Sequence, residues 1–231
     1  MSIFRESLSR SLDEAGITYE QTQIALCEEY YKLVFEANKH MNLTRITDEE
    51  QAAKQHFSDS ARVFSFLDIP SGSGVIDIGS GAGFPGMPVK LLRPDIEMTL
   101  LDSSAKKCEF IKRAADKLGV GVTVIAGRAE EEARGLLRES FDFVLSRAVA
   151  PLNMLLELCA AFIRVGGAFA AWKGESYEEE LSQAPGAIKT LGCRVNDAHF
   201  IDPGAIILIE KQKPAPDLYP RRFSKIKSNP L

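Results

Sequence analysis

The stretch Gly74-Val-Ile-Asp-Ile-Gly-Ser-Gly-Ala-Gly-Phe-Pro-Gly86 joins a short apolar run to a loop that is rich in glycine. Val75, Ile76 and Ile78 predict a buried β-strand. The glycines that follow leave the backbone free of side chains, so a ligand can approach the loop closely. In open α/β sheets, a loop between a strand and a helix is the usual place for a nucleotide-like cofactor. We therefore expect an α/β fold built around this loop.

Two cofactor classes fit the glycines taken alone. Gly81-Ala-Gly-Phe-Pro-Gly86 matches the pattern G-x-G-x-x-G, which indicates a nicotinamide or flavin enzyme. Asp77, two residues before Gly79, adds an acidic residue to three strictly alternating glycines, a pattern typical of S-adenosylmethionine-dependent methyltransferases. A carboxylate at this point would repel a pyrophosphate but suits the ammonium group of a methionine. We favour S-adenosylmethionine, with a nicotinamide-dependent oxidoreductase and a purely structural turn as alternatives.

The chain has 231 residues, of which 45% are hydrophobic and 26% are charged, as in an ordinary globular protein. Its N-terminus carries charges every few residues, and its most apolar stretch, residues 152–163, is too short to span a bilayer. We therefore expect a soluble, cytoplasmic monomer that makes no membrane contact. The cysteines and histidines are too scattered for a metal site, so we expect no metal and four buried free thiols, Cys27, Cys108, Cys159 and Cys193.

The apolar pattern changes near residue 70. Before this point it predicts a helix over residues 3–15, a second that a capping box at Thr18 opens and that runs to about residue 38, and a third that Thr47-x-x-Glu50 opens and that runs to residue 67. After it, strands alternate with helices, which predicts βαβ units and a parallel sheet. We expect strands over 74–79, 97–102, 121–126, 141–146, 167–172, 194–201 and 204–211, and helices over 85–92, 104–118, 128–138, 151–164 and 175–191.

The last two strands are too close in sequence for a crossover, so they must pair antiparallel. Five parallel strands followed by such a hairpin predict an α/β fold, the Rossmann-like sheet of class I S-adenosylmethionine-dependent methyltransferases, preceded by N-terminal helices. We expect an N-terminal helical extension over residues 1–70, the methyltransferase domain over 71–213 and a basic C-terminal tail over 214–231. Residues 211–231 hold six basic and one acidic side chain, whereas the whole chain has a net charge of −4. Such a tail is either a solvated, disordered end or a contact surface for nucleic acid.

Ligands of such sheets lie at the carboxyl ends of the strands, so we expect the site residues there. Asp102 ends the second strand and can accept hydrogen bonds from both ribose hydroxyls of a nucleoside. Ser103 and Ser104 either contact the ligand or cap the next helix. Glu130 either meets an adenine or is a solvated acid in the first turn of a helix. Trp172 either stacks on a base or packs inside the protein.

Several motifs together resemble the bacterial glucose-inhibited division protein B family, the 16S ribosomal RNA guanine-N7 methyltransferases. These motifs are Met41-Asn-Leu-Thr44, His56-x-x-Asp59-Ser60, Asp77 to Gly86, Leu100-Leu-Asp-Ser103, Gly127-Arg-Ala-Glu130, Ser146-Arg-Ala148 and Tyr219-Pro-Arg221. The resemblance implies methyl transfer from S-adenosyl-L-methionine to N7 of a guanine, with 16S ribosomal RNA or the small ribosomal subunit as partner. It places cofactor contacts on Gly79, Phe84, Asp102, Ser103, Ser104, Ala129, Glu130 and Arg147.

Guanine N7 already presents a lone pair and has no proton to remove, so this reaction needs no general base. We therefore predict no particular catalytic residue, although the fold places Arg147 and Lys173 near the reacting groups. A methyltransferase that acts on a small molecule is the alternative on the same fold, and for it the basic tail would be irrelevant.

Overall fold

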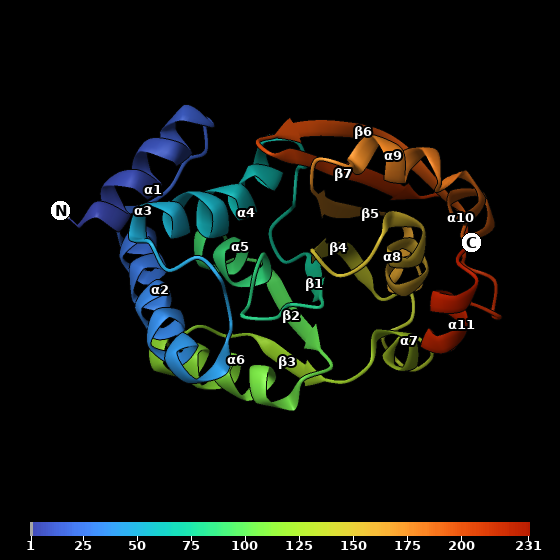
Figure 1. The fold of residues 1–231 in the computed structure, drawn as a ribbon, viewed down its shortest axis with the longest axis horizontal. Helices are drawn as coiled ribbons and strands as arrows, with labels where there is room; N and C mark the ends of the chain where they lie inside the picture. Colours follow the sequence, from blue (N-terminus) through green and yellow to red (C-terminus); the bar gives the residue numbers. More distant parts are fainter. Residues whose placement is uncertain (1) are drawn as a thin grey trace. The chain divides into compact units, whose positions relative to one another are not determined.

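The structure is a computed structural model that describes residues 2–231. Its seven strands have the order β3-β2-β1-β4-β5-β7-β6, mostly parallel with a C-terminal antiparallel hairpin, as the sequence predicts (Figure 1). The chain divides into two compact units. Unit 1 comprises Met1–Gly72 and Ser80–Ala126, and unit 2 comprises Ser73–Gly79 and Gly127–Leu231. The division into domains at residues 70 and 213 stays a prediction.

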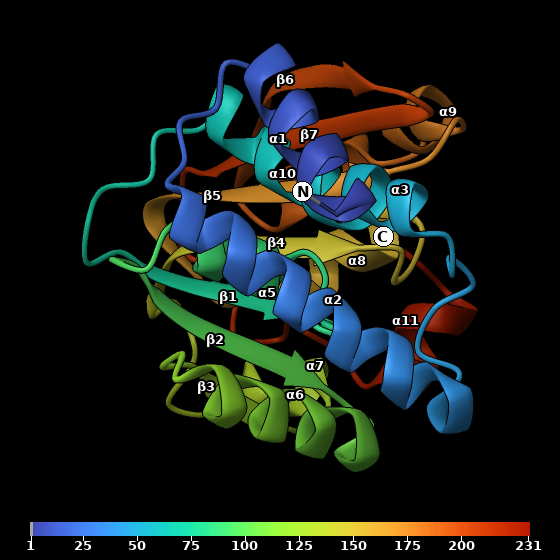
Figure 2. The same cartoon turned by 90° about the vertical axis from the view of Figure 1, so that its left-hand side faces the viewer.

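Unit 1 contains the N-terminal helices, β2 and β3. The long helix α2 lies across α5 and α6, which places the N-terminal segment against the helices that follow the glycine loop (Figure 2). Strands β2 and β3 are parallel, with Asp102 at the end of β2 paired to Ala126. The elements are α1 (Ile3–Glu14), α2 (Gln21–Met41), α3 (Glu49–Ala52), the π-helical turn η1 (Ala53–Ser58), α4 (Asp59–Ala61), the 3-10 turn η2 (Arg62–Ser65), α5 (Gly86–Leu92), β2 (Glu97–Asp102), α6 (Ala105–Leu118) and β3 (Thr123–Ala126).

Aromatic side chains form the centre of unit 1. Phe4 of α1 and Phe57 of η1 lie edge to face with ring centroids 4.9 Å apart. Tyr30 of α2 contacts both Phe57 and Phe84, the latter in the glycine loop. Each such pair adds about 1 kcal/mol to the gain from burying the rings. The N-terminal helices therefore share one apolar core with the loop.

Unit 2 contains β1 and the last four strands. Strands β1, β4 and β5 are parallel, and β7 is antiparallel to both β5 and β6. Helix α8 contacts α7, α10 and α11 (Figure 1). The elements are β1 (Gly74–Ile78), α7 (Ala129–Glu132), β4 (Phe141–Arg147), α8 (Leu152–Cys159), β5 (Ile163–Lys173), α9 (Tyr177–Ser182), α10 (Pro185–Thr190), β6 (Cys193–Ile201), β7 (Gly204–Lys211) and α11 (Phe223–Ser228).

Four predicted helices differ from the observed ones. The helix expected over 128–138 ends at Glu132 and continues as turns, and the one expected over 151–164 ends at Cys159 because β5 begins at Ile163. The helix expected over 175–191 is split into α9 and α10 at Pro185, which takes the first position of α10. The helix expected to begin at the Thr47 box and to run to residue 67 is a succession of short α, π and 3-10 segments.

The two predicted capping boxes are also wrong. The N-cap of α2 is Glu20, whose backbone N–H donates to the Gln23 side chain. The N-cap of α3 is Asp48, whose carboxylate accepts from the Gln51 backbone N–H. Both true caps are acidic residues, which also complement the positive end of a helix dipole.

The four cysteines are free and buried, as predicted. Burial raises the pKa of the Cys27 and Cys159 thiols well above the ordinary value. Two of the thiols, Cys27 and Cys108, belong to unit 1, and the other two, Cys159 and Cys193, belong to unit 2. Within residues 2–231, no helix combines the length and the apolar character needed to cross a bilayer.

The basic tail, residues 214–231, packs on unit 2 instead of extending into solvent. Arg138 donates from Nη1 to the Tyr219 carbonyl over 2.8 Å and from Nη2 to the Ala215 carbonyl over 2.7 Å. Arg221 forms an ion pair with Glu157 of α8, with Nη2 and Oε2 2.6 Å apart, and the Glu157 side chain is completely buried. The interpretation of the tail as a disordered end is therefore wrong.

Candidate functional site

The glycine loop of unit 1 is held by α2. The Tyr30 hydroxyl donates to the Ala82 carbonyl over 2.7 Å, and both groups are buried. Gly83 has a φ of +87°, in the region that favours glycine, and a Cβ at this position would collide with the Tyr30 hydroxyl. The loop therefore keeps its close backbone packing only because residue 83 has no side chain.

Asp102 connects the end of β2 to the glycine loop. Its Oδ2 accepts from the Gly81 backbone N–H over 2.9 Å, and its Oδ1 accepts from the Ser104 backbone N–H over 2.8 Å. A carboxylate has about four acceptor positions, so each oxygen can still accept one ribose hydroxyl. The two backbone contacts fix the orientation in which the carboxylate would receive them.

The two serines after Asp102 differ in their surroundings. Ser104 is the N-cap of α6, and its hydroxyl accepts from the Lys107 backbone N–H over 3.4 Å. The capping interpretation is therefore confirmed for Ser104. Ser103 is exposed beside it.

Phe84 and the motifs upstream of it form one cluster in unit 1. The Phe84 ring stacks on the His56 ring with centroids 4.5 Å apart. Thr44 Oγ1 and His56 Nε2 lie 2.7 Å apart in a hydrogen bond, and Asn38 binds both backbone groups of Thr44. Residues from three separate motifs thus meet beside the glycine loop, and this cluster fixes the Phe84 ring.

Unit 2 holds the end of β1 through the Ser146-Arg-Ala148 motif. The buried Ser146 hydroxyl donates to the Ile78 carbonyl over 2.8 Å. Gly79 follows with a φ of +75°, and a Cβ there would collide with Val149. Ser146 and Gly79 therefore hold the carboxyl end of β1 against the segment that follows β4.

The segment after β4 carries backbone strain. Ala148 has a φ of +57°, an unfavourable conformation for a residue with a side chain, and such strain concentrates at functional sites. Lys173 stabilises this segment, because its Nζ donates to the Ala150 carbonyl over 2.7 Å and lies 2.6 Å from Glu180 Oε2. Glu180 Oε2 also accepts from the Leu152 backbone N–H over 2.7 Å. Lys173 is thus occupied as an anchor of the segment.

Two strand-end residues of unit 2 lie next to this segment. Arg147 is half-buried at the carboxyl end of β4, where it is paired in register with Trp172. Trp172 is only 3% exposed, which confirms that it packs inside the protein and does not present its ring to a base.

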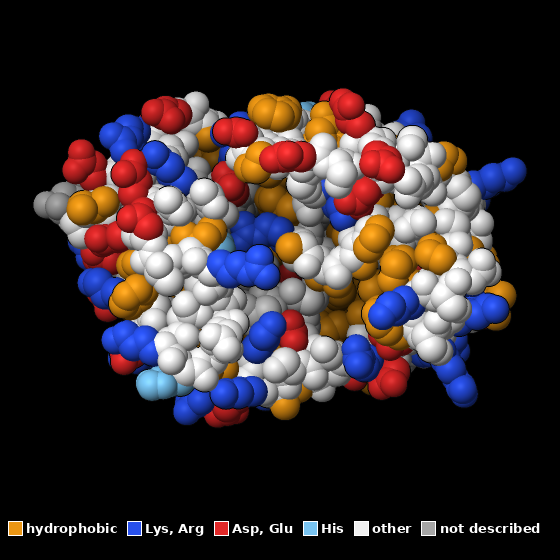
Figure 3. Space-filling view, viewed as in Figure 1, with side chains coloured by type: hydrophobic (Ala, Val, Ile, Leu, Met, Phe, Trp, Pro, Cys, Tyr) orange, Lys and Arg blue, Asp and Glu red, His pale blue; other side chains and the backbone are white. Residues whose placement is uncertain are grey.

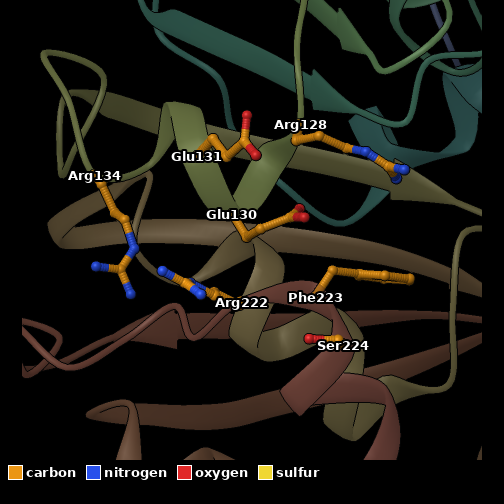
Figure 4. Close-up of a pocket in the computed structure, with 7 residues that line it drawn as sticks. All are labelled: Arg128, Glu130, Glu131, Arg134, Arg222, Phe223 and Ser224. Carbon is orange, nitrogen blue, oxygen red and sulfur yellow. The ribbon is translucent and has the colours of Figure 1, made fainter.

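Ala129 and Glu130 begin the short helix α7. The Glu130 side chain is buried, so its interpretation as a solvated helix acid is wrong. Three acidic residues occupy this first turn, Glu130, Glu131 and Glu132, and basic side chains surround it. A pocket of about 560 Å³ opens here, lined from α7 and the basic tail (Figure 4).

The predicted cofactor residues thus fall into one group in each unit: Phe84, Asp102, Ser103 and Ser104 in unit 1, and Gly79, Ala129, Glu130 and Arg147 in unit 2. A glycine loop with open backbone and a pre-oriented carboxylate fits the nucleoside and amino-acid parts of S-adenosylmethionine. Within residues 2–231, no group of three or more His, Cys, Asp or Glu side chains is arranged to hold a metal ion.

Some residues that build the site carry no sequence signal of their role. Tyr30 reads as one apolar position of an amphipathic helix, and its partner Ala82 is 52 residues away. Glu180 reads as one of three exposed acids at the start of α9. Ser146 did have a signal, because it begins one of the family motifs, but the motif alone did not reveal its contact with Ile78.

Comparisons with known proteins point to one family. The family model described as rRNA small subunit methyltransferase G matches residues 23–206. A protein of Clostridium beijerinckii named ribosomal RNA small subunit methyltransferase G is 38% identical and aligns over 99% of both chains. A protein of the same name from Moorella thermoacetica is 42% identical over 94% of both chains. Among solved structures, a SAM-dependent methyltransferase from Aquifex aeolicus matches in fold, with a TM-score of 0.55, 17% identity and coverage of 70% of this chain and 94% of the other.

Proposed function

Because the chain belongs to the rRNA small subunit methyltransferase G (GidB) family, we propose that it methylates N7 of a guanine in 16S ribosomal RNA. Membership of this family confirms the resemblance of the motifs and makes the chain a S-adenosylmethionine-dependent methyltransferase. The nicotinamide-dependent alternative is therefore wrong. The observation that carries the proposal is 38% identity over 99% of the chain to a relative named for this ribosomal activity.

Eight residues are proposed to contact the cofactor. Asp102 would accept the ribose hydroxyls, since its two oxygens are already oriented by the Gly81 and Ser104 backbone. The glycine loop would receive the methionine part, and the residues that begin α7 would border the adenine. When bound, S-adenosylmethionine supplies a methyl group on a positively charged sulfur. The proposed contacts are Gly79, Phe84, Asp102, Ser103, Ser104, Ala129, Glu130 and Arg147.

The protein's contribution to the chemistry would be alignment. Guanine N7 lies in the plane of the base and carries no proton, so the attacking atom needs no activation by a general base. Holding a base and a methyl donor in line can by itself lower the barrier by several kcal/mol. Arg147, half-buried at the carboxyl end of β4, would donate to an acceptor such as guanine O6, which arginine recognises well. The rigid segment behind it, anchored by Lys173 and Glu180, supports this role.

The charge distribution supports an RNA substrate over a small molecule. Figure 3 shows acidic side chains gathered over α9 and basic ones over α11. A net negative protein that carries positive charge on its C-terminal helix offers RNA a basic surface there. A small-molecule methyltransferase would have no use for this arrangement.

Incubation with radiolabelled S-adenosylmethionine and small ribosomal subunits that lack the modification tests the proposal. We expect label in 16S RNA, and mass mapping of its fragments should place one extra methyl group on a guanine as 7-methylguanine. Label found only in small molecules, or on a position other than N7, would contradict the proposal.

Asp102→Ala and Glu109→Gln form a matched pair of variants for this experiment. Glu109 is an exposed acid on α6 whose salt-bridge distance to Arg113 is 3.5 Å, so its loss should leave transfer unchanged. Asp102→Ala should weaken cofactor binding by at least about tenfold, since it removes the acceptor for two hydroxyls. Equal activity of the two variants would remove Asp102 from the site.

A further inference from the structure

A charged pocket beside α7 is lined by three arginines, more than S-adenosylmethionine would need for its binding. Arg128 and Arg134 enter it from the two ends of the α7 region, and Arg222 enters from the basic tail (Figure 4). Glu130 and Glu131 also line it, so the pocket has a formal charge of +1 from three arginines and two glutamates.

The positive charge is concentrated at one end of this pocket. Figure 4 shows the guanidinium groups of Arg134 and Arg222 pointing toward one another, while the carboxylates of Glu130 and Glu131 point elsewhere. Arg134 Nη2 donates to the Pro220 carbonyl over 2.6 Å, a neutral acceptor. Among the described residues, neither Arg134 nor Arg222 forms an ion pair with a carboxylate. Two guanidinium groups that face each other repel, and an anion placed between them would relieve that repulsion.

The backbone that carries Arg222 is firmly held. The neighbouring Arg221 donates to Glu157 of α8 from its backbone N–H and from its side chain, at 2.6 to 2.8 Å. Phe223, the next residue, lies under the guanidinium of Arg128 at 5.7 Å. The backbone at Arg222 is therefore fixed on both sides, so binding a ligand has to order only its exposed side chain.

The cofactor does not account for an anion at this end of the pocket. S-adenosylmethionine carries no phosphate, and its one carboxylate belongs to the methionine part, which is proposed to lie at the glycine loop. Glu130 is proposed to border the adenine instead. Two guanidinium forks match the oxygens of a phosphate diester, the group that recurs along an RNA chain.

We propose that Arg134 and Arg222 form a phosphate-binding site that holds one backbone phosphate of the RNA substrate. The inference rests on the proposed function, because it takes the RNA to be the source of the phosphate. It gives the basic tail a defined contact with RNA, distinct from general attraction by its lysines.

The variant Arg222→Gln tests this site, with Lys227→Gln as the matched control. Both residues are exposed basic side chains of the same tail, but only Arg222 lines the pocket. Binding of 16S ribosomal RNA is measured by filter binding over a series of salt concentrations. Arg222→Gln should weaken binding about tenfold and make the salt slope shallower by about 0.7, the value for one phosphate of a single strand. Lys227→Gln should change both quantities less than Arg222→Gln does, because Lys227 adds only to the general attraction between the tail and RNA.

Arg222→Lys separates charge from geometry. It should restore the salt slope, because the charge remains, but only part of the affinity, because an ammonium group lacks the planar fork. Binding of S-adenosylhomocysteine should be the same in all three variants. A loss of S-adenosylhomocysteine affinity without a change in RNA affinity would overturn the proposal and assign Arg222 to the cofactor.

The two proposals fail in different ways. If wild-type protein methylates 16S RNA while Arg222→Gln and Lys227→Gln bind it equally, the phosphate site is wrong and the proposed function stands. If the wild type neither binds nor methylates the RNA, calorimetry with inorganic phosphate decides whether Arg134 and Arg222 bind an anion at all. Binding that is lost in Arg222→Gln would support the anion site but exclude RNA as its source, and no binding would overturn both proposals.

Discussion

Gly83 is the residue whose replacement tests the glycine loop most directly. Gly83→Ala should lower the free energy of unfolding by at least about 2 kcal/mol, because the positive φ is unfavourable and the new Cβ collides with Tyr30 and Met87. Gly119→Ala is the control, since Gly119 also has a positive φ but meets no atom within 4 Å. Its cost should be about 1 kcal/mol. Urea unfolding measures both, and equal costs would show that the collision is relieved without penalty.

Asp95 offers a second prediction at this scale, concerning pH. Hydrogen bonds from Arg93 lower the pKa of Asp95 from 3.8 to about 2. A carboxyl whose pKa is lowered by folding stabilises the protein fully above its unfolded pKa, and this stabilisation is lost as the pH falls through about 2. The side chains of Arg93 and Asp95 are 30% and 35% exposed, so solvent screening keeps the contribution below about 1 kcal/mol.

Asp95→Asn should therefore be less stable than wild type by a constant amount between pH 6 and pH 7, and by a smaller amount at pH 3. Asp116→Asn is the control, because Asp116 is exposed and forms no ion pair among the described residues. Urea unfolding at each pH gives the difference. A difference for Asp95→Asn that persists undiminished at pH 3 would mean that the carboxylate charge is not its source.

At the scale of elements, α2 acts as a support for the glycine loop. Tyr30→Phe removes the buried hydrogen bond to Ala82 and should cost about 1 kcal/mol of unfolding free energy. It should also weaken S-adenosylhomocysteine binding, because the loop loses a fixed backbone position. Tyr31→Phe removes only an exposed hydrogen bond of 3.4 Å to Thr47 and should change neither quantity. Calorimetric titration and urea unfolding of the two variants test this, and similar behaviour would separate α2 from the site.

Most strands could be predicted from sequence because they are compact apolar runs next to a glycine, proline or acidic turn, whereas β6 also carries polar residues and was predicted from its pairing in the terminal hairpin. Helix ends were harder to predict, since the reasons lie in tertiary structure. The turns after Glu132 pack against the basic tail, because Arg134 and Arg138 donate to its backbone carbonyls. No local sequence pattern indicates a partner more than 70 residues away. Pro185 interrupts the helix expected over residues 175–191, although the apolar spacing of this stretch continues past it.

The candidate site shows the same division between local and distant information. Asp102 and the glycines were found because their chemistry follows from spacing along the chain. The hydrogen bonds of Tyr30 and Glu180 cannot be predicted in this way, because they join side chains to backbone groups of distant segments. The sequence leaves two interpretations of Trp172, and the burial of its ring decides between them.

At the scale of the whole molecule, the basic tail is both a charged surface and a structural part of unit 2. Deleting residues 214–231 removes the partner of the buried Glu157, which should cost about 3 kcal/mol or more of unfolding free energy. The variant Lys225→Gln/Lys227→Gln also reduces the positive charge, but keeps Arg221 and should unfold like the wild type. Urea unfolding separates the two. A deletion as stable as the wild type would mean that Glu157 finds solvent or another partner.

The four buried thiols can report the unfolding of each unit, because they react only when they become exposed. Alkylation requires access and a thiolate, and burial with a raised pKa denies both to Cys27 and Cys159 in the folded state. Cys27 and Cys108 sample unit 1, and Cys159 and Cys193 sample unit 2. Pulses of iodoacetamide at rising urea concentration, followed by peptide mass spectrometry, should therefore give the urea concentration at which each unit unfolds. No introduced label is needed. Simultaneous labelling of all four would show that the two units lose their structure in one cooperative step, and staggered labelling would show which unit opens first.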